Sequence, residues 1–105
     1  MKLIKAIIRP EMVDSVVDAL EAAGHPAFTK LEIVGRGKQG GLKVGEIVYN
    51  ELSKTMILLA IEEDELDEMI EIIKSKAHTG QFGDGKIFVQ PIEESYTIRT
   101  GEKHV

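Results

Sequence analysis

The chain has 105 residues, of which 43% are hydrophobic and 30% charged, and this fits one globular domain with a core of its own. It contains no cysteine, which excludes disulfides, thiolate metal sites and a cysteine nucleophile. The net charge of −5 argues against an extended nucleic-acid interface, so any bound phosphate must meet a local cluster of cations. No apolar run is long enough to cross a membrane and no signal segment opens the chain, so we expect a cytoplasmic protein.

The first third of the chain predicts a strand, a helix and a second strand. Residues 2–9 place apolar side chains at every second position, as in a strand that is covered on one side. Pro10 suits the first turn of a helix, and the apolar positions after it recur at helical spacing up to a stop at Gly24. Residues 28–34 alternate again and predict the second strand.

The second half repeats this order after a long connection. Residues 55–61 form an unbroken apolar run, which is typical of a central strand. A helix is predicted to begin at Asp64, with acidic residues early and lysines late, as the helix dipole favours. Residues 86–89 predict a fourth strand, and residues 96–99 predict a short terminal one.

These elements predict an α+β domain with the ferredoxin-like split βαβ plan (βαββαβ). Four strands would form one antiparallel sheet with both helices on one face, and a long loop would join strands 2 and 3. The other face of the sheet then needs a cover of its own. Oligomerisation would supply that cover.

The segment 35–54 is predicted to be a long loop, because it is rich in glycine and shows no sustained periodicity. Loops of this length in a compact domain are usually functional or disordered. It begins Gly35-Arg36-Gly37-Lys38-Gln39-Gly40-Gly41, which is cationic and flexible, and its later part carries the apolar Val44, Ile47 and Val48. We interpret it as a mobile effector loop that meets a partner. The alternative is a long hairpin without a partner.

The strongest chemical signal is His78-Thr79-Gly80-Gln81-Phe82-Gly83-Asp84-Gly85-Lys86. Its glycines let backbone N–H groups turn inward around an anion, while Thr79 adds a hydroxyl and Lys86 a positive charge. It is not a P-loop, because a helix precedes it, a strand follows it, and no Ser or Thr follows the lysine. The stretch predicts a phosphate site or, alternatively, a plain glycine-rich turn.

No nucleophile, base and orienting group are assembled along the sequence, so we expect a protein that is not an enzyme. The alternative is a phosphate-hydrolysing enzyme of the acylphosphatase type on the same fold. That enzyme needs an arginine-bearing cradle before the first helix, and here Arg9-Pro10 leads directly into the helix. A structural adaptor without ligands is a third alternative. His25, His78 and His104 lack the spacing of a zinc site.

Four short blocks, spread over nearly the whole chain, occur in the order of one known family. They are Ala6-Ile7-Ile8-Arg9-Pro10, the block from Gly35 to Gly41, Thr79-Gly-x-x-Gly-Asp-Gly-Lys86-Ile-Phe-Val, and Ile98-Arg99-Thr100-Gly101-Glu102. Together they resemble the PII nitrogen-regulatory signal-transduction proteins. The resemblance implies a homotrimer with ATP or ADP in each cleft between neighbours. It also implies 2-oxoglutarate bound through Mg²⁺, and a protruding loop that grips a regulated target.

The resemblance further implies roles for single residues. The nucleotide-binding residues would be Gly35, Arg36, Gly37, Lys38, Thr79, Gly83, Asp84, Gly85, Lys86 and Arg99. Arg99 would reach the phosphates from a neighbouring subunit. Gln39 is similar to the glutamine that coordinates Mg²⁺ with 2-oxoglutarate, and Lys54 to the lysine that pairs with a 2-oxoglutarate carboxylate. Lysine and arginine suit phosphate oxygens, and a neutral amide oxygen suits Mg²⁺.

The sequence departs from the family pattern in two places. Thr97 stands where a second arginine is common, two positions before Arg99, which puts nucleotide affinity in doubt. The long loop is shorter than in the common bacterial members, and Tyr49 lies too near its end to serve as their modified tyrosine. The short loop resembles the nitrogenase-regulating, archaeal NifI-type branch. We therefore expect a sensor, homotrimeric or mixed with a paralogous subunit, whose target is an enzyme of nitrogen metabolism such as a nitrogenase component protein.

Overall fold

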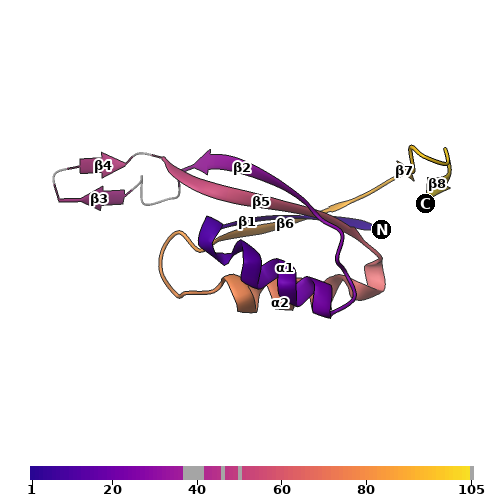
Figure 1. The fold of residues 1–105 in the computed structure, drawn as a ribbon, viewed down its shortest axis with the longest axis horizontal. Coiled ribbons are helices and arrows are strands. Elements are labelled where there is room, and N and C mark those ends of the chain that lie inside the picture. Colours follow the sequence, from indigo (N-terminus) through magenta and orange to yellow (C-terminus); the bar gives the residue numbers. More distant parts are fainter. Residues whose placement is uncertain (37–41, 46, 50, 105) are drawn as a thin grey trace.

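The computed structural model describes residues 1–36, 42–45, 47–49 and 51–104. Its centre is a four-stranded antiparallel sheet in the order β2-β5-β1-β6 (Figure 1). The strands are β1 (Lys2–Ile8), β2 (Thr29–Gly35), β5 (Leu52–Ile61) and β6 (Gly85–Pro91). The predicted central strand is confirmed, since β5 pairs with β1 on one side and with β2 on the other.

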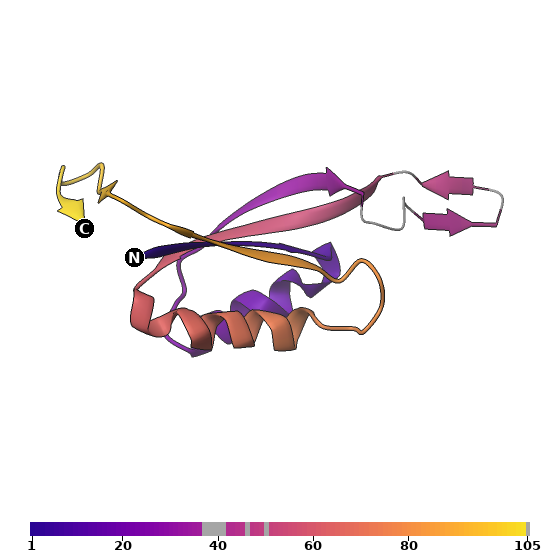
Figure 2. The ribbon, with the colours of Figure 1, turned by 180° about the vertical axis from the view of Figure 1, so that it is seen from behind.

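Two α-helices, α1 (Val13–Ala22) and α2 (Leu66–Ala77), cover one face of this sheet (Figures 1 and 2). The predicted ferredoxin-like arrangement, with both helices on the same face, is therefore confirmed. Among the described residues no helix is long and apolar enough to span a membrane.

The helices begin later than their sequence patterns predict. Each is preceded by a 3-10 turn, η1 (Pro10–Met12) before α1 and η2 (Glu63–Glu65) before α2. In the first turn the N–H of Met12 donates to the carbonyl oxygen of Arg9 at 3.0 Å, which is the tighter hydrogen bond of a 3-10 turn. The start predicted at Pro10 is the start of η1 and the one predicted at Asp64 lies within η2, because both kinds of helix favour the same residues at their amino ends.

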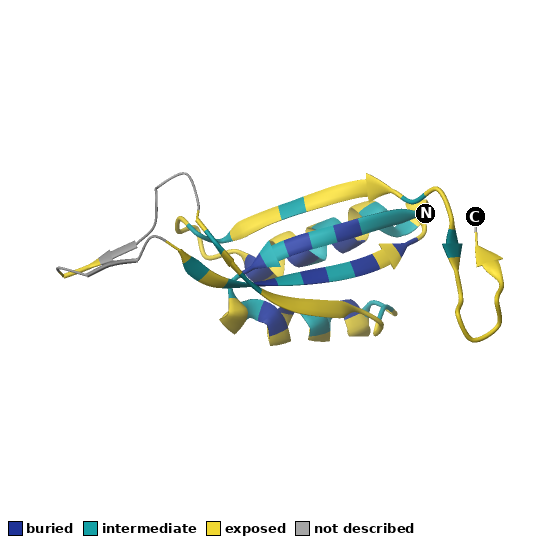
Figure 3. Cartoon of the chain, turned by 90° about the horizontal axis from the view of Figure 1, so that it is seen from above, coloured by how far each residue is buried: buried dark blue, intermediate teal, exposed yellow. Residues whose placement is uncertain are grey.

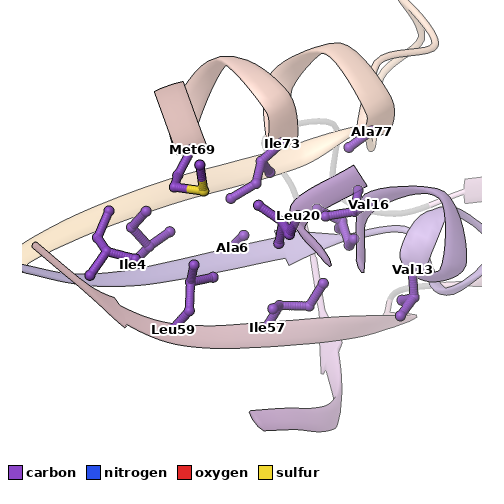
Figure 4. Close-up of a cluster of buried hydrophobic side chains, with 12 residues drawn as sticks. Ile4, Ala6, Val13, Val16, Leu20, Ile57, Leu59, Met69, Ile73 and Ala77 are labelled. Atoms are coloured by element: carbon purple, nitrogen blue, oxygen red, sulfur yellow. The ribbon is translucent and has the colours of Figure 1, made fainter. Parts of the chain in front are cut away.

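The hydrophobic core fills the space between the sheet and the helices (Figure 4). Its buried residues are Ile4, Ala6, Ile8, Val13, Val16, Leu20, Ile57, Leu59, Ile61, Met69, Ile73 and Ala77. Burying a large apolar side chain contributes about 1.5–3 kcal/mol, so this cluster holds both helices against the sheet. The predicted one-sided alternation of the first strand is found here, because its buried members all face the helices.

Along β1 and β5 the buried residues alternate with less buried ones, which lie on the opposite face of the sheet (Figure 3). Leu31 in β2 is 43% exposed and Phe88 in β6 is 45% exposed. The strand register puts Leu31 beside Met56, and Met56 beside Ile7, on this face. One chain therefore presents an apolar sheet face that suits a further layer.

The segment predicted as one long loop, 35–54, is shorter than predicted and contains strands. Gly35 ends β2 and Leu52 begins β5, so the connection comprises residues 36–51. Within it β3 (Leu42–Val44) and β4 (Ile47–Tyr49) pair as an antiparallel hairpin beyond the end of the main sheet (Figure 1). Strands of three residues are too short to show an alternating pattern, which is why the sequence did not reveal them.

The chain ends in a second small hairpin, formed by β7 (Ser95–Tyr96) and β8 (Lys103–His104). The prediction of one terminal strand at 96–99 is therefore wrong. Most of that segment is a turn, closed by the N–H of Gly101 donating to the carbonyl oxygen of Thr97 at 2.7 Å. This hairpin lies at the opposite end of the molecule from the β3–β4 hairpin (Figures 1 and 2).

Candidate functional site

The glycine-rich loop joins α2 to β6 at the end of the sheet from which the β3–β4 hairpin extends (Figure 1). At this end Ile8, the last residue of β1, pairs with Gly85, the first residue of β6. His78 is the C-cap residue of α2. The topology therefore brings the loop beside the residues that follow β1 and those that open β5.

Asp84 holds this loop together. Its Oδ2 atom accepts the backbone N–H of Thr79 at 2.8 Å and that of Gly80 at 2.9 Å. Its Oδ1 atom accepts the Thr79 hydroxyl and, at 3.2 Å, the Nε–H of Arg9. The Thr79 hydroxyl and then the Thr79 N–H hold the pKa of Asp84 far below its usual range, because they favour the ionised carboxylate. Asp84 is thus a fixed anion inside the loop.

This arrangement changes the interpretation of the loop as an anion-binding nest. The N–H groups of Thr79 and Gly80 already bind the carboxylate of Asp84. Thr79 also accepts the N–H of Gln81 at 3.1 Å through its hydroxyl oxygen. The hydrogen bonds of Asp84 and Thr79 therefore act within the loop, and a direct contact of either residue with a nucleotide stays a prediction.

Glycine is favoured at Gly83 by its backbone conformation and at Gly85 by a close approach of the backbone as well. Gly83 has a φ of +95°, and a Cβ there would lie 3.3 Å from Nη2 of Arg9 and 3.4 Å from Nζ of Lys54. Gly85 has a φ of +113°, and a Cβ there would lie 1.8 Å from the carbonyl oxygen of Ile7. The missing side chain at Gly83 leaves room for Arg9 and Lys54 beside the loop. The missing side chain at Gly85 lets the chain enter β6 directly beside β1.

Arg9 and Lys54 converge on neighbouring carbonyl groups of the loop. Nη2 of Arg9 donates to the carbonyl oxygen of Phe82 at 2.7 Å, and Nζ of Lys54 donates to that of Gly83. Burial and then the charge of Arg9 lower the pKa of Lys54, since both disfavour the protonated amine. The negative charges of Glu11 and Asp84 act in the opposite direction and partly offset the repulsion between Arg9 and Lys54.

Arg9 is a site residue that the sequence analysis missed. It stands 75 positions before Asp84 in the chain, so no local pattern joins the two residues. A signal was present, because Arg9 extends the alternation of β1 by one step onto the face of Ile7, immediately before Pro10. A basic residue at that point must lie at the end of the sheet.

Lys86 adds a further positive charge at the same end. It pairs with Ile7 of β1, and Ile7 pairs with Met56 of β5. Because side chains alternate between the two faces of a strand, Lys86 and Lys54 lie on the same face, the one without helices. The side chain of Lys86 is exposed. Two predicted lysines and the arginine that was not predicted therefore occupy one end of one sheet face.

Two hollows, each of about 490 Å³, flank this end of the sheet. One is lined by Pro10, Glu32, Ile33, Val34, Ser53, Lys54 and Thr55. The other lies between α2 and β6 and is mainly apolar, with Asp84 and Lys86 among its lining residues. Their volume falls in the range of small-ligand clefts. Lys54 thus lies between the glycine-rich loop and the first hollow.

Some of the other predicted site residues lie away from the glycine-rich loop or outside the described residues. Arg99 lies in the turn of the C-terminal hairpin, at the opposite end of the molecule (Figure 1). Within one chain Arg99 is thus separated from the glycine-rich loop, and its contact with phosphates from a neighbouring subunit stays a prediction. Gly35 ends β2, and Arg36 follows it as an exposed residue. Gly37, Lys38 and Gln39 lie outside the described residues.

Each histidine of the chain contacts a different carboxylate. His25 contacts Glu65, His78 lies 3.9 Å from Asp84, and His104 lies 3.1 Å from Glu62. Across the described ranges no group of three or more His, Cys, Asp or Glu side chains could hold a metal ion. The predicted metal ligand Gln39 stands outside those ranges.

Comparison with known proteins decides the family. The family described as "Nitrogen regulatory protein P-II" matches residues 1–102. This chain belongs to the P-II family. It is 69% identical over 102 residues to "Nitrogen fixation nifHD region GlnB-like protein 1" of Methanothermococcus thermolithotrophicus, a match that covers 97% of both chains. The protein with the same name in Methanobacterium ivanovii is 55% identical over 103 residues, covering 98% of both chains.

A third relative carries the name of the family itself. "Nitrogen regulatory protein P-II 2" of Methanothermobacter thermautotrophicus is 42% identical over 106 residues, covering 97% of this chain and 92% of its own. The predicted resemblance to the P-II family and to its archaeal branch associated with nitrogen fixation is thereby confirmed. The chain is a nitrogen regulatory protein of a family whose members are signalling proteins and typically trimers.

Proposed function

We propose that this P-II protein senses ATP or ADP together with 2-oxoglutarate and relays the bound state to a target through the connection 36–51. The observation that carries the proposal is the convergence of Arg9 and Lys54 on the carbonyl oxygens of Phe82 and Gly83, beside Lys86. The chain has a net charge of −5, and here three cations gather around the one carboxylate of Asp84, which pairs with Arg9. Such a cluster suits ligands that carry several phosphate or carboxylate oxygens.

The nucleotide would lie against the glycine-rich loop, with its phosphates toward Lys86. Asp84 and Thr79 would keep the backbone of Gly83 and Gly85 in place. The further contacts proposed come from Gly35, Arg36, Gly37, Lys38 and, from a neighbouring subunit, Arg99. The separation of Arg99 from the loop within one chain supports a site that two subunits share.

The 2-oxoglutarate would pair one carboxylate with Lys54, beside the hollow between the end of β2 and the start of β5. The lowered pKa of Lys54 reflects burial next to Arg9, and a carboxylate would offset both influences. Mg²⁺ would join the second carboxylate to the nucleotide phosphates and to the side-chain oxygen of Gln39. Oxygen donors of this kind are those that Mg²⁺ prefers.

The assembly proposed is a homotrimer, or a mixed oligomer with a paralogous subunit. The apolar sheet face that includes Leu31 and Phe88 supports it, because contact with other subunits would bury these side chains. We propose further that the protein binds its ligands without transforming them and that it works in the cytoplasm.

The target proposed is a nitrogenase component protein. The support comes from relatives named for the nifHD region in nitrogen fixation. The hairpin formed by β3 and β4 is the segment that would meet this target, since it lies beyond the main sheet.

Isothermal titration calorimetry with ATP, ADP and 2-oxoglutarate, each with and without Mg²⁺, tests the proposal. We expect both nucleotides to bind and 2-oxoglutarate to bind only with ATP and Mg²⁺ present. A parallel assay for phosphate release from ATP and from an acyl phosphate should show no turnover. A protein that binds neither nucleotide under any of these conditions, or that hydrolyses either compound catalytically, would not be the proposed sensor.

A further inference from the structure

Arg9 leaves the end of β1 and reaches a loop that is distant in sequence. Its backbone is extended (φ −63°, ψ 138°), and Pro10 directly after it begins the turn η1. Its side chain makes two contacts in the loop, from Nε to Oδ1 of Asp84 at 3.2 Å and from Nη2 to the carbonyl oxygen of Phe82 at 2.7 Å. The planar guanidinium thus spans two acceptors that stand two residues apart.

The pair formed by Arg9 and Asp84 is partly shielded from water. Their side chains are 23% and 24% exposed. Charge pairs in such places resist screening by salt better than those on an open surface. The geometry is also specific to arginine, because a lysine offers one point of positive charge and not a planar fork.

Asp84 connects Arg9 to the start of the loop through its two carboxylate oxygens. Its Oδ1 atom accepts from Arg9, while its Oδ2 atom holds the N–H groups of Thr79 and Gly80. The contacts of Arg9 therefore fix the middle of the loop through Phe82, and its beginning through Asp84. Gly83, which lies between those two residues, has no side chain to obstruct the guanidinium.

We infer that Arg9 is a positioning residue for the phosphate-binding loop, acting through Asp84 to hold residues 79–85 in the shape that meets an anionic ligand. The inference rests on the proposed function for the identity of that ligand as a nucleotide. Arg9 would thus support the loop and not contact the ligand itself, because its Nε and Nη2 groups already donate to Asp84 and Phe82 in the loop.

The test combines amide hydrogen exchange, ATP titration and a double-mutant cycle on the full chain. The variants are Arg9→Gln, Asp84→Asn and the two together, with Arg9→Lys as the conservative change. Lys2→Gln is the matched control, since Lys2 pairs with Glu63 at 3.3 Å at the other end of β1. Thermal unfolding establishes that each variant is folded.

We expect Arg9→Gln to speed the exchange of the Thr79 and Gly80 amides and to weaken ATP binding about tenfold, the effect of one charge-assisted hydrogen bond. The double variant should bind ATP no more weakly than Asp84→Asn alone, because both residues act along one path. Arg9→Lys should restore little of the affinity, and Lys2→Gln should leave both measurements unchanged.

Effects of the two substitutions that multiply in the double variant would overturn the inference, because Arg9 would then act without Asp84. Unchanged exchange of Thr79 and Gly80 in Arg9→Gln would overturn it as well, whatever the ligand. If the unsubstituted protein bound no nucleotide, the proposed function would fail, and the exchange measurement alone would still decide whether Arg9 positions the loop.

Discussion

Gly85 lies so close to Ile7 that a Cβ on Gly85 would stand 1.8 Å from the Ile7 carbonyl oxygen. Both atoms belong to strands that pair, Gly85 with Ile8 and Lys86 with Ile7, so neither can move without opening the ladder between β6 and β1. The residue that ends the glycine-rich loop is therefore fixed by the sheet. The shape of the loop and the stability of the sheet depend on the same position.

We predict that Gly85→Ala destabilises the protein by at least about 2 kcal/mol, from backbone strain at positive φ together with the clash. Gly24→Ala is the control, because Gly24 also has a positive φ of +96° but would place its Cβ in open space. That control should cost only about 1–2 kcal/mol, the cost of the left-handed conformation itself. Urea unfolding measures both. Equal losses in the two variants would mean that the contact with Ile7 relaxes freely.

We predict that Lys86→Ala weakens ATP binding about tenfold or more while the fold stays intact, since a charge-assisted contact contributes roughly 1.5–3 kcal/mol. Lys86 is exposed, so its removal leaves the core untouched. Titration calorimetry measures the affinity, and Lys76→Ala, a change of another exposed lysine near the end of α2, is the control. ATP affinity equal to that of the control variant would remove Lys86 from the site.

The hydrogen bonds to Asp84 predict a specific dependence of stability on pH. They lower the pKa of Asp84 in the folded protein, so they stabilise it at pH values above the unfolded pKa of about 3.9. This contribution is lost as the pH falls toward the folded pKa and Asp84 takes up a proton. The difference in unfolding free energy between the unsubstituted protein and Asp84→Asn should therefore be constant from about pH 6 to 8 and shrink in acid. Urea unfolding across pH measures it, and a difference that grows in acid would contradict the assignment.

We predict that 2-oxoglutarate binds only when ATP and Mg²⁺ are both present. Arg9 is paired with Asp84 and Lys86 is proposed to meet the phosphates, so Lys54 is the cation of this cluster left for 2-oxoglutarate, and a dianion needs more than one positive charge to leave water. Titration in Mg²⁺ and in a chelator should differ strongly, and Gln39→Ala should abolish the difference by preventing 2-oxoglutarate binding. Full binding by that variant would exclude Gln39 as the metal ligand, and full binding in chelator would exclude the metal.

We predict that the β3–β4 hairpin holds the target and that ligands release it. Replacing residues 42–49 by a short glycine-serine link should leave ATP binding intact, because the hairpin pairs within itself and not with the main sheet. Pull-down with the nitrogenase component protein measures capture. ATP and 2-oxoglutarate together should release the unsubstituted protein, since a ligand that favours one state of the connection must weaken binding to the other. Capture by the shortened variant at the parental level would exclude the hairpin as the effector.

The sequence by itself determined the fold class and the main elements. The apolar residues of β1, α1, β5 and α2 recur at regular spacing because each element buries one row of side chains in a shared core. Burial selects apolar residue types, and a regular spacing of such residues can be recognised in the sequence. The four family blocks also determined the family, because their glycines and charged residues stand at fixed places along the chain. The same spacing drew attention to Thr79, Asp84 and Lys86 as neighbours in one loop.

Only the tertiary structure decided what those neighbours do. In the folded protein the N–H groups of Thr79 and Gly80 donate to Asp84. Arg9, which follows β1, and Lys54 of β5 also donate to the loop. Hydrogen bonds and charge pairs between residues far apart in the chain leave no periodic trace, because direction and distance in space select them. The short strands of the two hairpins are defined by their backbone pairing. Each has only two or three residues, which is too few for an alternating side-chain pattern to be recognised in the sequence.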